Sequence, residues 1–207
     1  ITDAISVQNF FDANKIKTVI HCAALARMGI CEADPAKAIN VNVNGTSNIV
    51  SSILASNKNC KMIFISTDGV YQSTTGDYSE DSPTIPYNIY GFTKLAGELI
   101  SRSVPNHLII RTRFFDKDSI MYRDSATDIF TSSIEINELV NIIFKLHIQD
   151  FKGVINVGSD PESDYIKYSR YKSDLKKCLR KDIVKNLDYE IAINSTLNLQ
   201  KLKKVLK

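Results

Sequence analysis

The sequence lacks the features that mark several large classes of protein. No apolar run approaches the ~20 residues that a membrane-spanning helix needs, and no secretory signal opens the chain. The formal net charge is only +3 over 207 residues, and the lysines are scattered until the last segment. We therefore expect neither a membrane partner nor a nucleic-acid partner.

Cysteine is also scarce, and it is not arranged for a metal site or a disulfide framework. Cys22, Cys31, Cys60 and Cys178 show no C-x-x-C spacing, and no paired histidines accompany them. Reduced thiols are the usual state in a cytoplasm. We therefore expect a cytoplasmic protein without a bound metal, in which Cys22 packs inside a buried strand.

What is present indicates one α/β core, and 207 residues suffice for it together with a small accessory lobe. Four short apolar runs lack the alternation of a half-exposed strand, so we expect them to be buried in a parallel sheet. These runs are residues 17–22, 62–65, 107–111 and 152–157. Helical patterns separate them, beginning at Asp3, at Asp34-Pro35 and at Pro86. In the first helix, Ile5, Phe10 and Phe11 are expected to face inward.

The stretch Lys61–Glu98 is the part of the chain with the clearest chemical pattern. Its apolar run stops at Ser66, Thr67 and Asp68, just past the carboxyl end of a strand, which is where open α/β sheets bind ligands. The helix expected after Pro86 carries Tyr90 and Lys94, four residues apart and so on one face. A nearby cation favours the phenolate, so Lys94 is expected to lower the pKa of Tyr90 by roughly 1–3 units, toward the range in which proton transfer is efficient.

Together, the segments S-T-D-G-V-Y at Ser66–Tyr71 and Y-G-F-T-K-L-A-G-E at Tyr90–Glu98 resemble the active-site region of the extended short-chain dehydrogenase/reductase family. Within that family they are most similar to the dTDP-4-dehydrorhamnose reductases. The resemblance implies a Rossmann-like doubly wound parallel sheet with a small C-terminal substrate-binding lobe. It also implies a catalytic set of Thr67, Tyr90 and Lys94, with Lys94 also binding the nicotinamide ribose.

The same resemblance implies further site residues. A cofactor, NADP or NAD, would lie against the turn after the first strand, the long helix, the active-site strand and the catalytic pair: Cys22, Ala23, Ala24, Leu25, Asn42, Ile65, Ser66, Tyr90 and Lys94. The substrate would lie against Asp68, Gly69, Phe114, Thr131, Ser132 and Ser133. The reductases carry a Gly and a Pro near the positions of Thr131, Ser132 and Ser133, and both are missing from this sequence. We expect residues 1–117 to form the nucleotide-binding domain and residues 118–207 to form mainly the substrate lobe, with a returning strand and helix.

The glycine-rich turn that holds a pyrophosphate in this fold is missing from the sequence. None of the eight glycines is spaced G-x-x-G-x-x-G, and the chain opens without Met. Either the sequence is a piece of a longer enzyme, or the protein is a truncated relative that cannot hold the dinucleotide. We favour the first, because an exposed sheet edge and an unfilled helix layer would destabilise the second.

The leading functional hypothesis is an NAD(P)H-dependent reductase of a nucleotide-linked 4-keto-6-deoxy sugar, in which Tyr90 donates the proton. A 4-epimerase needs the same three residues and stays an alternative. A 4,6-dehydratase is disfavoured, because Gly69 stands where those enzymes carry a catalytic Glu. A non-catalytic binding subunit is the alternative of another class, and a homodimer paired through the long helices is possible.

Overall fold

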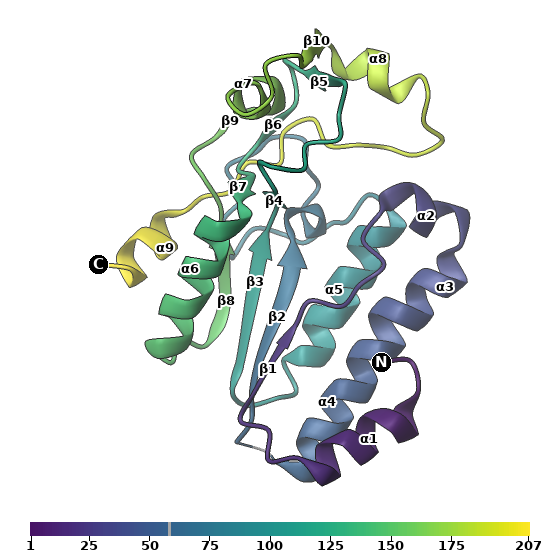
Figure 1. Cartoon of the computed structure of the whole chain (residues 1–207), viewed down its shortest axis with the longest axis vertical. Helices are drawn as coiled ribbons and strands as arrows, with labels where there is room; N and C mark the ends of the chain where they lie inside the picture. The colour runs from purple at the N-terminus through teal and green to yellow at the C-terminus, as the bar shows by residue number, and fades with distance from the viewer. Residues whose placement is uncertain (58) are drawn as a thin grey trace.

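The central element is a four-stranded parallel sheet. The computed structural model describes residues 1–57 and 59–207, and the sheet order is β1 (Thr18–His21), β2 (Lys61–Thr67), β3 (His107–Thr112) and β8 (Gly153–Val157) (Figure 1). Each strand falls on one of the four predicted runs. The predicted α/β fold with a parallel sheet is thus confirmed.

Helices cover both faces of this sheet, so its central strands are buried on two sides. On one face lie α1 (Ala4–Ala13), α4 (Gly45–Ser56) and α5 (Ile89–Ser101), and on the other lie α6 (Ile136–Ile148) and α9 (Gln200–Val205) (Figure 1). Strand β2 serves both layers: Met62 and Phe64 pack toward α4, whereas Ile63 and Ile65 pack toward α6. This is the two-residue alternation of an extended strand, with both sides apolar.

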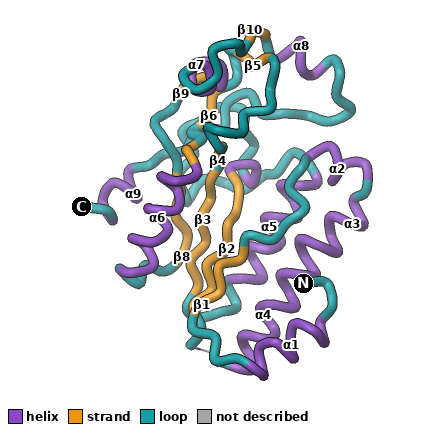
Figure 2. Tube along the Cα trace, viewed as in Figure 1, coloured by secondary structure: helices purple, strands orange, loops and turns teal. Residues whose placement is uncertain are grey.

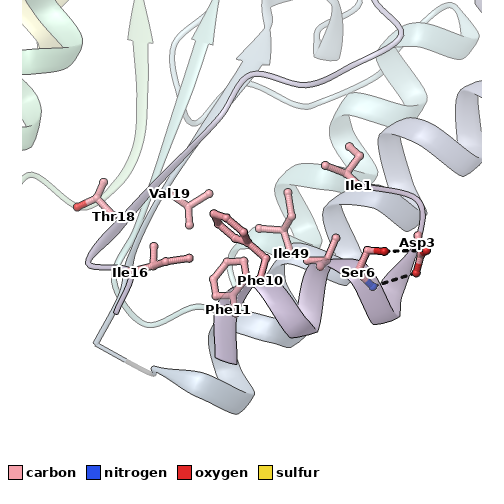
Figure 3. A pocket seen from close by; sticks show the side chains of 10 residues that line it. Ile1, Asp3, Ser6, Phe10, Phe11, Ile16, Thr18, Val19 and Ile49 are labelled. Atoms are coloured by element: carbon pink, nitrogen blue, oxygen red, sulfur yellow. Dashed lines mark hydrogen bonds between the residues drawn. The ribbon is translucent and has the colours of Figure 1, made fainter. Parts of the chain in front are cut away.

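Strand β1 is less buried than its sequence indicated. Ile20 is 54% exposed, because β1 pairs only with β2 within residues 1–57 and 59–207. Helix α1 begins at the predicted Asp3 cap and buries Phe11, but Ile5 and Phe10 are 74% and 61% exposed, so their predicted inward placement is wrong. Phe10 borders an open apolar hollow between α1, β1 and α4, beside Val19 and Ile49 (Figure 3).

Two predicted element boundaries shift by a few residues. Helix α5 begins at Ile89 rather than at Pro86, because the Asn88 side chain accepts the backbone N–H of Gly91 and caps the helix. Strand β2 continues through Ser66 and Thr67, so these are its last residues instead of the first residues beyond it. The helix after α2 (Met28–Ala33) starts with Pro35 as predicted, but α3 (Pro35–Ile39) passes through a π-helical turn at Asn40–Asn44 before α4.

A small lobe lies beyond the carboxyl ends of the main strands (Figure 2). Its strand pairs are β4 (Phe114–Phe115) with β7 (Ile134–Glu135), β5 (Asp124–Ala126) with β10 (Lys176–Cys178), and β6 (Phe130–Thr131) with β9 (Glu162–Ser163). Helices α7 (Asp164–Ser169) and α8 (Arg180–Val184) accompany them. The boundary after residue 117 stays a prediction. None of the helices formed by residues 1–57 and 59–207 has the length and apolar character needed to cross a membrane.

Candidate functional site

The predicted catalytic residues gather where β2 ends and α5 begins. The Thr67 hydroxyl accepts the backbone N–H of Gly69 at 3.1 Å and donates to Asp68 Oδ1 at 3.1 Å. Helix α5 approaches this turn closely at Gly91, where a Cβ would stand 2.4 Å from the Gly69 carbonyl oxygen. Because only glycine permits that approach, Gly91 allows α5 to carry Tyr90 up to the end of β2.

The electrostatic environment of Tyr90 differs from the prediction. Burial, followed by the negative charge of Asp68, raises the pKa of Tyr90 to about 12, while Thr67 and the charge of Arg113 act in the opposite direction. Burial lowers the pKa of Lys94 to about 8, and its ammonium lies 4.1 Å from the centre of the Phe64 ring. The prediction that the pKa of Tyr90 is lowered is therefore wrong for this structure. Among the largest influences on this pKa, the cation whose charge favours the phenolate is Arg113.

The residues predicted to line a cofactor are held together by Asn42, which the π-helical turn presents to its neighbours. Its side-chain oxygen accepts the backbone N–H of Leu25 at 2.7 Å, and its Nδ2 donates to the Leu25 carbonyl and to Thr93 Oγ1, next to Lys94. Asn42 thus ties the turn after β1 to α5. The two alanines in that turn are at least partly accessible, at positions 23 and 24.

Cys22 begins the same turn and is exposed, so the prediction that it packs in a buried strand is wrong. Strand β1 ends at His21, one residue before it. Ile65 and Ser66 lie deeper than a cofactor-lining role requires. Ile65 packs in the core beneath α6, and Ser66 Oγ donates to Glu98 Oε1 at 2.5 Å. Their assignment to the cofactor stays a prediction.

The predicted substrate-binding residues beyond β3 differ in exposure, since Phe114 is exposed and the other three are buried. Phe114 is 48% exposed at the start of β4, open to a ligand. Thr131, Ser132 and Ser133 are buried: Thr131 Oγ1 donates to Asp164 Oδ1, Ser132 Oγ accepts the Leu197 N–H, and Ser133 offers its carbonyl to Lys167. In this structure Thr131 and Ser132 brace the lobe through their side chains, and Ser133 does so through its backbone carbonyl.

Asp68 is also fully engaged, because Thr67, Ser195 and Arg113 all contact its carboxylate. Arg113 and Asp164 were missed in the sequence. Arg113 was detectable, since it directly follows a buried strand and precedes Phe114. Asp164 and Ser195 gave no signal, because they reach this region only through the fold.

His21, the last residue of β1, is buried, and its environment makes the stability of the protein depend on pH. Its Nε2 lies 3.0 Å from Thr46 Oγ1, which donates to the Asn42 carbonyl, so Nε2 is the donor to the threonine oxygen. Burial, with a smaller contribution from Lys94, lowers the pKa of His21 to about 4. In the unfolded chain, histidine has a pKa near 6.5. Between pH 6.5 and about 4, the unfolded chain therefore binds a proton at His21 and the folded chain does not. We expect the contribution of His21 to the free energy of unfolding to be complete above pH 6.5 and to fall by ~3 kcal/mol as the pH drops to about 4.

Urea unfolding between pH 4 and pH 7 measures this, with His21→Gln as the comparison, because carboxylates titrate in both proteins alike. The difference in unfolding free energy between the two proteins should shrink as the pH falls. A difference that stays constant over this range would contradict the assignment.

The fold and the site together define a class. A parallel Rossmann-like sheet with a Thr and a Tyr-x-x-x-Lys pair at its carboxyl edge is the arrangement of the extended short-chain dehydrogenases/reductases, and the resemblance seen in the sequence is confirmed. More closely, the chain belongs to the family described as "RmlD substrate binding domain", whose profile matches residues 1–125.

Among curated relatives, the dTDP-4-keto-6-deoxy-D-glucose reductase of Streptomyces niveus is 35% identical over 99 residues, which is 47% of this chain and 34% of the relative. Methionine adenosyltransferase 2 subunit beta of Xenopus laevis is 29% identical over 157 residues, covering 72% of this chain and 46% of the relative. The chain thus spans between a third and a half of the length of these relatives.

Solved structures share the fold over nearly the whole chain. A dTDP-4-dehydrorhamnose reductase from Clostridium acetobutylicum superposes with a TM-score of 0.87 at 20% identity, covering 98% of this chain and 79% of that one. The enzyme of the same name from Bacillus anthracis, solved in complex with NADP, gives 0.86 at 21% identity and the same coverage. At these identities the likeness establishes the fold.

Proposed function

We propose that this chain carries the catalytic residues of an NAD(P)H-dependent reductase acting on a nucleotide-linked 4-keto-6-deoxy sugar. The observation that carries the proposal is the approach of α5 to the end of β2 at Gly91, which brings the hydroxyls of Thr67 and Tyr90 to one place with Lys94 a turn further along. The names of the reductases matched in sequence and in structure support the substrate class.

The residues present fit the nicotinamide end of a dinucleotide. Lys94 is 3% exposed, and within residues 1–57 and 59–207 its ammonium is found in no hydrogen bond or ion pair but lies 4.1 Å from the centre of the Phe64 ring. A ribose hydroxyl would give this buried donor a partner. Ala23 and Ala24 leave space for a flat ring at the end of β1. When bound, the nicotinamide would supply the hydride; the glycine-rich turn that would hold its pyrophosphate is not in this sequence.

The chain's own residues would orient the substrate and move the proton. Thr67 is positioned to hydrogen-bond the keto oxygen and hold it beside Tyr90. A phenol with a pKa of about 12 is protonated at neutral pH, as a proton donor must be before the reaction. Tyr90 would then pass its proton to the oxygen as negative charge develops on it.

A non-catalytic subunit is the second candidate. The observation that favours it is the match to proteins named as the beta subunit of methionine adenosyltransferase 2, which covers 72% of this chain. A binding subunit does not require Thr67, Tyr90 and Lys94 to be placed together, so we rank it below the reductase.

Turnover separates the two candidates. The protein is mixed with dTDP-4-keto-6-deoxy-D-glucose and either NADPH or NADH, and nicotinamide oxidation is followed by absorbance. The reductase proposal predicts oxidation that needs both the sugar nucleotide and the protein. In a parallel assay with UDP-glucose, formation of its 4-epimer without net oxidation would favour the epimerase. Binding of a nucleotide without either reaction would favour the binding subunit.

A further inference from the structure

Arg113 is a charged group of the site that the proposed reaction does not use. It directly follows β3 and lies at the same edge of the sheet as Thr67. Its Nε is 2.9 Å from Asp68 Oδ2. Within residues 1–57 and 59–207, Asp68 is the one carboxylate that forms an ion pair with Arg113, and no hydrogen bond from either Nη group to these residues is found. The side chain is 27% exposed, against 2% for Asp68.

The Asp68 carboxylate is fixed from three sides, which fixes Arg113 in turn. Oδ1 accepts the Thr67 hydroxyl at 3.1 Å, and Oδ2 accepts the Ser195 hydroxyl at 2.7 Å as well as contacting Arg113. Ser195 comes from the C-terminal segment, 127 residues away in sequence. A buried carboxylate with these partners has little capacity left for a ligand, so Asp68 orients the guanidinium through Nε and leaves the Nη donors for another partner.

The neighbours of Arg113 place it beside the reacting position. Its positive charge acts on the phenols of Tyr87, Tyr90 and Tyr168 and on the carboxyl of Asp164. These groups come from α5 and the segment before it on one side and from α7 on the other. Arg113 thus lies between the catalytic set and the small lobe, where the ring of a sugar held by Thr67 and Tyr90 would extend.

We infer that Arg113 is a specificity-determining residue that contacts the substrate, its Nη groups donating to the hydroxyl oxygens of a neutral hexose next to the carbonyl held by Thr67 and Tyr90. This rests on the proposed function. The planar fork of a guanidinium suits two neighbouring oxygens. Asp68 already pairs with the guanidinium at 2.9 Å, so little positive charge is left to attract the carboxylate of a sugar acid. The site therefore selects a neutral sugar over a hexuronic acid.

Titration calorimetry with matched ligands tests this. The ligands are glucose and glucuronic acid, each linked to UDP or to dTDP, together with UDP and dTDP alone. For the nucleotide that the protein accepts, we expect the glucose form to bind at least tenfold more tightly than the glucuronic acid form. Arg113→Gln should weaken binding of the glucose form at least tenfold and leave the bare nucleotide unchanged, because the contact is with the sugar.

Two further variants separate the loss of the guanidinium contact from the loss of positive charge and from an effect on folding. Arg113→Lys keeps the charge beside Asp68 but loses the fork, so it should retain the fold and show an intermediate loss. Arg170→Gln is the matched control: Arg170 pairs with Glu162 on the same lobe, its side chain is 56% exposed, and binding should not change. Thermal melting verifies that each variant is folded.

The possible failures are distinct. An equal loss of the bare nucleotide in Arg113→Gln would show a phosphate contact and overturn the inference, as would no loss for either ligand. Equal binding of the glucose and glucuronic acid forms to the unmodified protein would overturn the selectivity. If no sugar nucleotide binds the unmodified protein, the proposed function itself fails.

Discussion

Replacing Tyr90 with phenylalanine is expected to lower the rate of sugar-nucleotide reduction by roughly 10²–10⁴-fold, the usual contribution of a positioned acid or base. The substitution removes one oxygen and keeps the ring, which α5 holds at the end of β2. Binding of cofactor and substrate should therefore change little. The measurement is kcat and KM from nicotinamide oxidation, with binding followed separately by calorimetry.

Tyr87→Phe is the matched control for that experiment. Tyr87 is a second phenol within the influence of Arg113 and Asp68, and burial raises its pKa. Its hydroxyl interacts with Ser73 and the Ala192 backbone instead of Thr67, so we expect a change in rate of less than about tenfold. Loss of activity in Tyr87→Phe with activity kept in Tyr90→Phe would exchange the roles of the two residues.

The second large effect is expected at a buried ion pair behind the site. Glu98 is fully buried on α5 and Arg111 is 2% exposed on β3. The guanidinium donates from Nε and Nη2 to the Glu98 carboxylate, with Nη2 2.8 Å from Oε2, and from Nη1 to Tyr71 Oη at 2.9 Å. Ser66 adds its hydroxyl to the same carboxylate. The pair thus joins β2, β3 and α5 directly beneath the catalytic residues.

Removing one charge of this pair leaves the other buried without compensation. Glu98→Gln is expected to lower the free energy of unfolding by ~3–5 kcal/mol, a large share of the stability of an ordinary domain. Urea unfolding measures it. Asp160→Asn, which breaks the exposed pair with Lys203, should change stability far less.

The double variant Glu98→Leu with Arg111→Met provides the internal comparison. It removes both charges together. The loss of unfolding free energy should therefore be smaller than the sum of the losses in Glu98→Leu alone and Arg111→Met alone. Strict additivity of the two single effects would show that the residues do not stabilise the fold as a pair.

Much of the architecture followed from local patterns. Apolar runs without alternation marked all four strands of the sheet, because a strand covered on both faces has no polar side to show. The Asp3 cap and the four-residue spacing of Tyr90 and Lys94 were equally local. The errors arose where burial depends on a partner element. Ile20 on β1 and Phe10 and Ile5 on α1 are apolar, yet no element among residues 1–57 and 59–207 covers them and they stay exposed.

By itself, the sequence determined the parallel sheet, the position of Thr67 at a strand end and the placement of Tyr90 and Lys94 on one helix, since strand and helix periodicity are properties of neighbouring residues. Only the tertiary structure decided the charge environment of that set. The ammonium of Lys94 lies over Phe64, the pKa of Tyr90 is raised, and Asp68 is engaged by Arg113 and by Ser195. A pKa and an ion pair depend on burial and on charges brought together from distant segments, and no spacing within one segment encodes them.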